Sequence, residues 1–263
     1  MYLVSIAIST ISNRIEKLDL IPYEGVQYII IHQDSHLATF EFLNMLIKRL
    51  DVVYVPLERK GLSASRNAAL ANSNTDYIMI MDDDVTFSID AIYNILGEMK
   101  KDKVDVATYY HKYTDGNSTL KYKKAFFHNK FNIANPSSID ICINRESVLK
   151  AAVNFDESFG LGSKYPSGEE MIFLSDCLKS GLKVKRYPLE ICVHPPIASG
   201  ADFFTTAQKT LAKAAMFKRV YPKSGSLFFI LFMIRKWPMA FRAGYGCTFI
   251  SNALRIILIS NNR

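Results

Sequence analysis

The sequence has few cysteines, and their spacing excludes two common ways of stabilising a small fold. The four residues Cys142, Cys177, Cys192 and Cys247 are widely scattered, and no two of them form a CxxC pair. A disulfide framework or a zinc cluster needs cysteines at close and regular spacings. We therefore expect neither, and isolated cysteines are typical of a reducing compartment such as the cytoplasm.

Long hydrophobic runs are also missing. Leu227–Ile234 is a run of eight apolar residues, whereas a membrane-spanning helix needs about 20. Met1–Ile6 contains neither a basic segment nor a small-residue cleavage site, so we expect no signal peptide and interpret it as part of a first strand. A hydrophobic fraction of 49% and a charged fraction of 22% indicate a folded protein and argue against disorder.

The most informative segment that is present is a group of three adjacent acids, Asp82–Asp84, directly after the apolar residues Tyr77–Met81. A short apolar run indicates a buried strand, and the carboxyl ends of strands in open parallel α/β sheets are where ligands bind. Three neighbouring carboxylates repel one another, and a hard divalent cation shared with substrate phosphates would stabilise them. The alternative is a solvated acidic turn in which an Asp caps the next helix.

Strand and helix patterns alternate through the first 200 residues, and neither a repeat nor a Gly/Ser linker divides them. We predict strands at residues 2–8, 26–31, 52–55, 77–81 and 104–108, and helices at residues 38–50, 62–71 and 89–99. This alternation predicts βαβ units and therefore an α/β fold with a mostly parallel, Rossmann-like sheet flanked by helices.

Polar residues follow the predicted strands at one edge of this sheet. The segments concerned are Ser9–Thr10, His32–Ser35, Arg59–Gly61 and Asp82–Asp84. Such an edge offers acids that accept hydrogen bonds from a base or ribose, basic residues for phosphate, and acids for a metal. Each segment alone is a weak signal, because strand ends are generally polar, but together they indicate a nucleotide site.

Several segments, in this order, resemble the family 2 glycosyltransferases. They are Asp34–Ser35, Gly61–Asn67 at the start of a helix, Met81–Asp84 after a strand, Phe155–Phe159, Gly168–Glu170, Ser180–Val184 and Val193–His194, with Ser199 downstream. The resemblance covers roughly residues 2–200. It implies the GT-A fold, a nucleotide-binding α/β domain with a DxD motif, and transfer of a sugar from a nucleotide donor, most simply a UDP-sugar.

The resemblance also implies roles for particular residues at the nucleotide. Asp34 would accept a hydrogen bond from the base, with Thr10 nearby. Arg66 and Asn67 would support the nucleotide pocket. Asp82 would contact the ribose.

The remaining implied roles concern the metal and the chemistry. Asp83 belongs to the same nucleotide-binding group, while Asp84, with Asp82 and His194, would bind Mn²⁺ or Mg²⁺. Glu169–Glu170 stands where the family usually has Glu-Asp, whose second acid is the catalytic base of an inverting displacement. The longer side chain leaves the choice between Glu169 and Glu170 open, and we favour Glu170.

Other interpretations of the same residues remain. Asp82–Thr86 also fits the DxDx(T/V) motif of haloacid dehalogenase-like phosphatases, although there the motif ends the first strand. A non-catalytic subunit that binds a nucleotide sugar is a second alternative. Glu169 and Glu170 could simply complement a helix dipole, and His194 could be a structural loop residue. A nucleotide-sugar pyrophosphorylase is less consistent, because the first strand is not followed by a glycine-rich basic loop.

The C-terminal residues 201–263 differ from the rest and are predicted to form a separate helical extension. They contain ten Lys or Arg and one acid, so the net charge of +7 is concentrated there. Short apolar segments bordered by basic residues and Trp237 suit an interfacial helix on an anionic membrane. We therefore expect a lipid-linked glycan acceptor and a peripheral position on the inner membrane face through residues 224–263, as in surface polysaccharide synthesis. The alternative is a pair of core helices. Nucleic acid is not expected as a partner, because the aromatics do not interleave with the charges.

Overall fold

The computed structural model describes residues 2–196 and 202–261. Its central feature is a curved mixed sheet with the strand order β3-β2-β1-β4-β8-β6-β9-β5, in which β7 also pairs with β9. The strands are β1 (Val4–Ile11), β2 (Val26–Gln33), β3 (Val52–Leu57), β4 (Tyr77–Asp82), β5 (Thr86–Phe87), β6 (Val106–Tyr113), β7 (Phe126–Phe127), β8 (Ile141–Asn144) and β9 (Val184–His194). Strands β3, β2, β1 and β4 are parallel, as are β6 and β9, which confirms the expected mostly parallel sheet.

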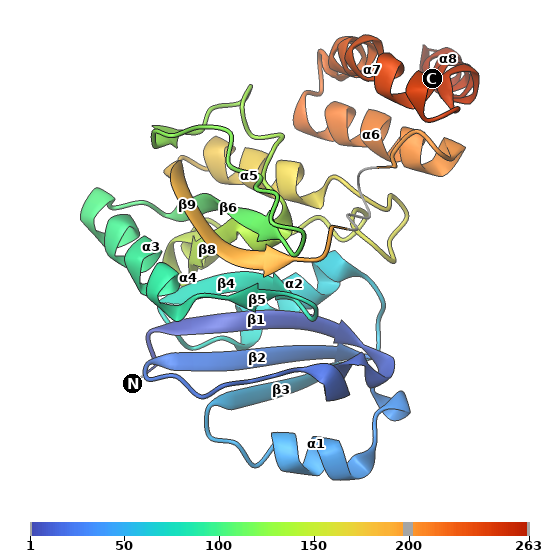
Figure 1. Cartoon of the computed structure of the whole chain (residues 1–263). Helices are drawn as coiled ribbons and strands as arrows, with labels where there is room; N and C mark the ends of the chain where they lie inside the picture. The colour runs from blue at the N-terminus through green and yellow to red at the C-terminus, as the bar shows by residue number, and fades with distance from the viewer. Residues whose placement is uncertain (1, 197–201, 262–263) are drawn as a thin grey trace.

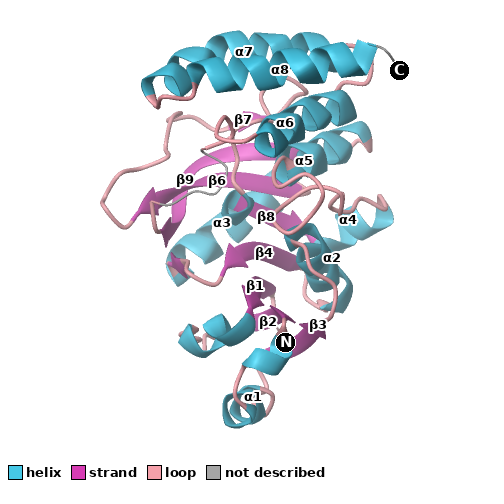
Figure 2. Ribbon diagram, turned by 90° about the vertical axis from the view of Figure 1, so that its right-hand side faces the viewer, coloured by secondary structure: helices cyan, strands magenta, loops and turns pink. Residues whose placement is uncertain are grey.

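Helices cover both faces of the sheet (Figures 1 and 2). They are α1 (Phe40–Leu46), α2 (Leu62–Asn72), α3 (Ile89–Asp102), α4 (Arg145–Lys150), α5 (Glu169–Lys179), α6 (Ala207–Val220), α7 (Gly225–Arg242) and α8 (Gly246–Asn261). One core cluster joins the sheet to α2, α4, α5 and the C-terminal helices, and the other joins it to α1 and α3. Every residue of β2 is buried, as expected for a strand between two parallel neighbours with both faces covered.

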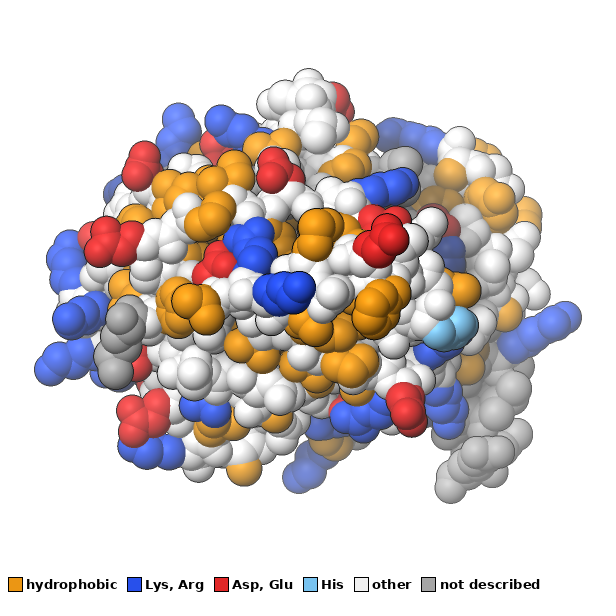
Figure 3. All heavy atoms as spheres, turned by 90° about the horizontal axis from the view of Figure 1, so that it is seen from below, with side chains coloured by type: hydrophobic (Ala, Val, Ile, Leu, Met, Phe, Trp, Pro, Cys, Tyr) orange, Lys and Arg blue, Asp and Glu red, His pale blue; other side chains and the backbone are white. Residues whose placement is uncertain are grey.

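The predicted elements are present, with shifted ends. The helix expected at residues 38–50 is only α1, Phe40–Leu46, in which Leu46 alone is buried. Figure 3 views this end of the molecule and shows hydrophobic side chains in separate groups with charged side chains between them. The strand expected at residues 104–108 starts at Val106 and runs on to Tyr113, because β9 pairs with it over this length.

The register of the strands places the predicted polar residues together. In the parallel pairs, Ser9 lies opposite Asp82 and Ile11 opposite Gln33. The carboxyl ends of β1, β2 and β4 therefore form one edge, and the acids after β4 lie at its centre.

The C-terminal helices are present as predicted, and they pack on the domain instead of standing apart. Helix α6 contacts α5, and α7 and α8 contact α6 and each other. Phe217 of α6 and Phe229 of α7 are buried in the same cluster as Phe173 of α5. The proposed division at residues 200/201 stays a prediction, and its boundary lies outside the described residues, as does Ser199.

Candidate functional site

Two adjoining cavities lie at the carboxyl edge of the sheet. The first, which we name the acid-lined cavity, has a volume of about 500 Å³, and its lining includes Thr10, Arg14, Gln33, Lys60, Gly61, Asp82, Asp83, Asp84 and His194. The second, which we name the glutamate cavity, has a volume of about 380 Å³, and its lining includes Arg66, His111, Glu169, Glu170 and Lys213. Leu62, Asp82, Leu161 and His194 line both cavities, so the two are neighbours across these side chains.

The three acids after β4 have different surroundings. Asp83 accepts a hydrogen bond from Thr10 Oγ1 at 2.7 Å and pairs with Arg14, whose guanidinium also lies 3.6 Å from Asp84 Oδ2. Burial raises the pKa of Asp82 and of Asp83 above the usual range of an aspartate. Asp83 is therefore held by the protein itself, while Asp82 and Asp84 have carboxylates available to a ligand in the cavity.

Asp84 and His194 form a pair of possible metal ligands. His194 ends β9, and its Nε2 lies 3.5 Å from Asp84 Oδ1. Two donor atoms at this separation can bind one cation, because metal–ligand distances of about 2.0–2.2 Å place neighbouring ligands about 3 Å apart. Among the described residues, no group of three His, Cys, Asp or Glu side chains forms a complete metal site. The residues present fit a cation that takes its other ligands from a bound substrate.

Asp34 lies beside the acid-lined cavity and not in its lining. It follows β2 in a left-handed conformation, with φ of 49°, and its carboxylate pairs with Lys60 Nζ at 3.0 Å. Lys60 itself lines the cavity. The side chain of Gln33 holds this loop in place, because its Oε1 accepts a hydrogen bond from Gly61 N at 3.0 Å.

Arg66 and Asn67 lie in the second turn of α2 but have different surroundings. Arg66 is 1% exposed, lies over the ring of Phe155, and its Nη1 is 3.1 Å from Glu169 Oε1. Asn67 exchanges two hydrogen bonds with the backbone of Phe155, at 2.8 and 2.9 Å. Asn67 therefore connects α2 to the loop after α4, which contains Phe155. Arg66 instead lines the glutamate cavity.

Glu169 and Glu170 occupy the first turn of α5. Gly168 precedes them with φ of 107°, and a Cβ there would lie 2.9 Å from the side chain of Met216 in α6, so glycine allows both the turn and the close packing. Glu169 is 4% exposed and held by Arg66, while Glu170 Oε1 lies farther from Arg66 Nη1, at 3.9 Å.

The protonation of Glu170 is tuned by this environment. Burial, and then the charge of Glu169, raise the pKa of Glu170 to about 7, while Arg66 and Lys213 act in the opposite direction. Burial also lowers the pKa of Lys213, against the attraction of both glutamates. A carboxylate that titrates near neutral pH is suited to accept a proton during a reaction.

Several residues that line these cavities were not predicted as site residues, among them Arg14, His111 and Lys213. Arg14 lies in the 3₁₀ helix after β1, His111 lies in β6, and Lys213 lies on α6. Nothing in the local sequence marks Lys213, because its position depends on how the C-terminal helices dock. Arg14 follows a strand that ends at the site, and this placement could have indicated it.

The fold and the carboxylate-lined edge are those expected of a GT-A domain, and the comparisons agree with that class. The family model described as glycosyl transferase family 2 matches residues 7–154. The chain therefore belongs to glycosyltransferase family 2, as the sequence motifs indicated. A comparison with curated proteins found no match.

Among solved structures, the chain is similar to S. aureus TarS. The structure of TarS 1-349 has 12% sequence identity and a TM-score of 0.60, with 97% of this chain and 90% of that one covered. TarS 1-349 in complex with UDP-GlcNAc gives 13% identity, the same coverage of both chains and a TM-score of 0.60. For a longer TarS structure, at 15% identity and a TM-score of 0.57, the match covers 83% of this chain and 40% of TarS, so this chain spans less than half of that protein. These similarities confirm the GT-A fold.

Proposed function

We propose that the protein transfers a sugar from a nucleotide-sugar donor, most simply a UDP-sugar, to a hydroxyl of a glycan acceptor with inversion at the anomeric carbon. The observation that carries the proposal is the arrangement of Glu170, whose pKa is raised to about 7, in a cavity that shares Asp82 and His194 with the acid-lined cavity. A proton acceptor would thus lie next to the proposed position of the diphosphate and its counter-charges.

The acid-lined cavity would hold the nucleotide diphosphate. Its acids and its basic residues Arg14 and Lys60 can bind ribose hydroxyls and phosphates, respectively. Asp34, which pairs with Lys60, would accept a hydrogen bond from the base. Thr10 and Asp83 would shape the floor of the cavity through their hydrogen bond. TarS has been crystallised in complex with UDP and with UDP-GlcNAc, which supports this choice of donor class.

Asp84 and His194, with Asp82, would hold a divalent cation, Mn²⁺ or Mg²⁺. An imidazole ligand beside carboxylates favours Mn²⁺ over Mg²⁺, because magnesium prefers oxygen ligands and water. When bound, such an ion stabilises the negative charge that develops on a leaving diphosphate. Arg14, 3.6 Å from Asp84 Oδ2, is a further positive charge at this place.

Glu170 would remove the proton of the acceptor hydroxyl as it attacks. Glu169 is less suited, because its Oε1 is 3.1 Å from the buried guanidinium of Arg66 and its charge is held in this pair. Glu169 and Arg66 would therefore position and tune Glu170. Lys213, which opposes the rise in the pKa of Glu170, would help to keep the base ionised.

The C-terminal helices suit a peripheral contact with a membrane. Helix α7 buries Phe229 and Met233 but exposes Leu227, Leu231 and Ile234 on its outer side. The basic residues Arg235, Arg242 and Arg255 are exposed beside these apolar side chains. None of the described helices is long and apolar enough to cross a bilayer. We propose that α7 and α8 lie on the inner face of an anionic membrane and present a lipid-linked glycan acceptor, as in surface polysaccharide synthesis.

A panel of nucleotide sugars, with and without Mn²⁺, tests the proposed activity through release of the nucleoside diphosphate. We expect metal-dependent hydrolysis of one donor class and binding of UDP to the acid-lined cavity. Binding of a donor with no turnover under any condition would instead support a non-catalytic nucleotide-sugar-binding subunit. Release of phosphate from simple phosphate esters would support the phosphatase alternative.

A further inference from the structure

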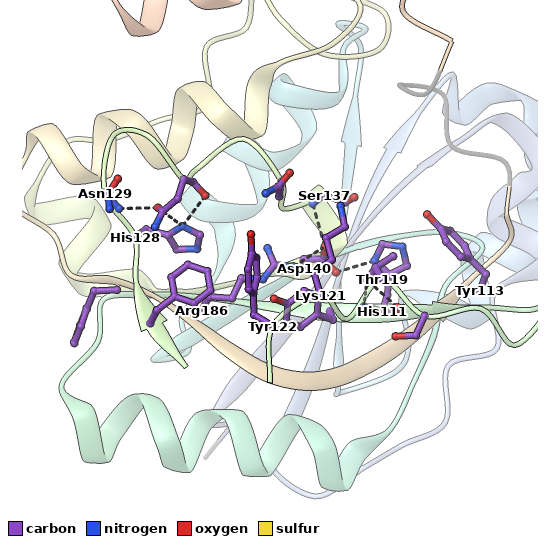
Figure 4. A pocket seen from close by; sticks show the side chains of 16 residues that line it. His111, Tyr113, Thr119, Lys121, Tyr122, His128, Asn129, Ser137, Asp140 and Arg186 are labelled. Carbon is purple, nitrogen blue, oxygen red and sulfur yellow. Dashed lines mark hydrogen bonds and ion pairs between the residues drawn. The ribbon is translucent and has the colours of Figure 1, made fainter. Parts of the chain in front are cut away.

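A third and larger cavity, of about 710 Å³, lies beside the glutamate cavity and shares no lining residue with the acid-lined cavity. It is formed by β6, β7, β9 and the segment 118–137, and His111, Tyr113, Asn135 and Ser137 line both it and the glutamate cavity. Figure 4 shows Tyr113 and His111 at one end, then Asp140 and Arg186, and His128 at the other end. A molecule with one end at Glu170 could therefore extend into this third cavity.

Arg186 is the unusual residue in this cavity. It lies in β9, is 4% exposed, and its guanidinium stacks on the ring of Tyr110 at 3.9 Å from the centroid. Its Nε and Nη1, and the hydroxyl of Tyr110, have no hydrogen-bond partner among the described residues. Buried polar groups are nearly always paired, because an unpaired donor loses its hydration without compensation. Unpaired donors on a buried cation point to a ligand that is an anion.

The acid nearest to Arg186 does not satisfy it. Asp140 Oδ2 is 4.0 Å from Arg186 Nη2, which is beyond hydrogen-bond distance. The carboxylate of Asp140 already accepts hydrogen bonds from His111 Nδ1 at 2.8 Å and from Ser137 N at 3.1 Å. The charge of Asp140 is thus shared with His111 and the backbone of Ser137, and Arg186, which lines the cavity, keeps donors without a partner among the described residues.

The remaining wall of the cavity is also suited to an anion. Residues 116–139 contain four lysines and no acid, and one of them, Lys121, lines the cavity. Burial lowers the pKa of His128 to about 4, so this histidine is neutral and adds no second buried charge. Tyr122 and Phe126 contribute aromatic rings, against which the apolar face of a sugar or polyol can pack.

We propose that this third cavity binds an anionic group of the acceptor, a phosphate or a carboxylate, with Arg186 as its ligand. The inference rests on the proposed glycosyltransferase function and specifies its acceptor as a charged glycan. The anion would lie in the third cavity while the reacting hydroxyl lies at Glu170. Arg186 would then select acceptors by charge, because a neutral acceptor leaves its buried donors unpaired.

A direct test follows the Arg186 Nε–H resonance by NMR in the full chain labelled with ¹⁵N-arginine, with assignment from Arg186→Lys. Inorganic phosphate or acetate is titrated with UDP present, so that binding of phosphate in the acid-lined cavity is not counted. We expect the Arg186 signal to shift with at least one anion, and the choice between phosphate and acetate distinguishes the two sources. Arg145 Nε, which donates to Leu70 O at 3.2 Å, is the control and should not shift. An Arg186 signal unmoved by both anions overturns the proposal.

A kinetic test compares sugars that are phosphorylated, carboxylated or neutral as acceptors. We expect anionic acceptors to be preferred, and Arg186→Gln to lower their kcat/KM by about 30-fold or more with a much smaller effect on neutral ones. Lys124→Gln removes an exposed positive charge of the same segment and serves as the matched control. Equal losses for all acceptors would contradict the inference. Failure of the protein to bind UDP or to turn over any donor would instead contradict the proposed function, and the NMR titration without UDP would still test Arg186.

Discussion

The substitution Glu170→Gln tests the proposed mechanism most directly, because the amide keeps the shape of the side chain but cannot take a proton. Removal of a general base lowers the rate by about 10²–10⁴-fold. We expect this loss in sugar transfer, with binding of the donor nucleotide retained. For the wild type, the rate of transfer should rise with pH through about 7, because the raised pKa of Glu170 leaves the carboxyl protonated below that value.

The same raised pKa predicts that the inactive variant is more stable than the wild type at alkaline pH. The folded protein holds the carboxyl of Glu170 with a pKa of about 7, against an ordinary value of 4.5, so ionising it costs folding free energy. The stabilising contribution of the protonated form is present below about pH 4.5 and is lost as pH rises through 7. The full shift corresponds to at most about 3 kcal/mol. The free energy of unfolding of Glu170→Gln should therefore exceed that of the wild type at pH 8. The difference between the two proteins should shrink as the pH falls towards 4.5.

Transfer assays and urea unfolding at pH 5 and pH 8 measure both effects. Glu146→Gln is the matched control, since Glu146 is exposed on α4 and pairs with Lys150 far from the cavities. Transfer activity of Glu170→Gln near that of the wild type would refute the assignment of the base. If Glu169→Gln shows the loss instead, the base is Glu169, and if neither does, the proposed mechanism is wrong. Equal stability of the Glu170→Gln variant and the wild type at pH 8 would refute the environment inferred for Glu170.

The other predictions concern the metal ligands, the tuning of the base and the C-terminal helices. Asp84→Ala should abolish metal-dependent donor turnover without loss of thermal stability, since it removes one of three adjacent acids that repel one another. Normal activity of this variant, or full activity of the wild type in EDTA, would exclude the metal site. Lys213→Met should move the rise of the pH–rate profile to higher pH, because Lys213 lowers the pKa of Glu170; an unchanged or lower midpoint would contradict this coupling. The protein should float with anionic liposomes and less with neutral ones or at 1 M salt, where the Debye length falls to about 3 Å. Arg235→Gln combined with Arg242→Gln should weaken flotation, and equal flotation at every charge and salt would exclude the electrostatic contribution. A truncation after Tyr221 would remove Phe229 from the core together with the exposed apolar and basic residues, so the surface substitutions are the cleaner test.

The sequence by itself determined the sheet and the place of the acids. The apolar residues Tyr77–Met81 predict a buried strand, and the three acids after it are expected at the end of that strand, because burial of ionised carboxylates in the core is costly. The family followed from the same local motifs, since each depends on a few adjacent residues. Element ends were less well predicted, as for β6, whose length is set by its pairing with β9.

Tertiary structure alone decided which charged groups meet inside the protein. Arg66 pairs with Glu169 across 103 residues of sequence, and Lys213 reaches Glu170 only because α6 docks on α5. Burial and the charge of Glu169 raise the pKa of Glu170 against these cations, and this balance exists only in the folded protein, so the sequence left the choice between the two glutamates open. The unpaired donors of Arg186 are likewise a property of the folded state, because they depend on the distance of Asp140 and on its other hydrogen bonds. Local sequence patterns predict the secondary structure and the polar residues at the ends of strands. Burial and charge pairing depend instead on contacts between segments that are distant in the sequence.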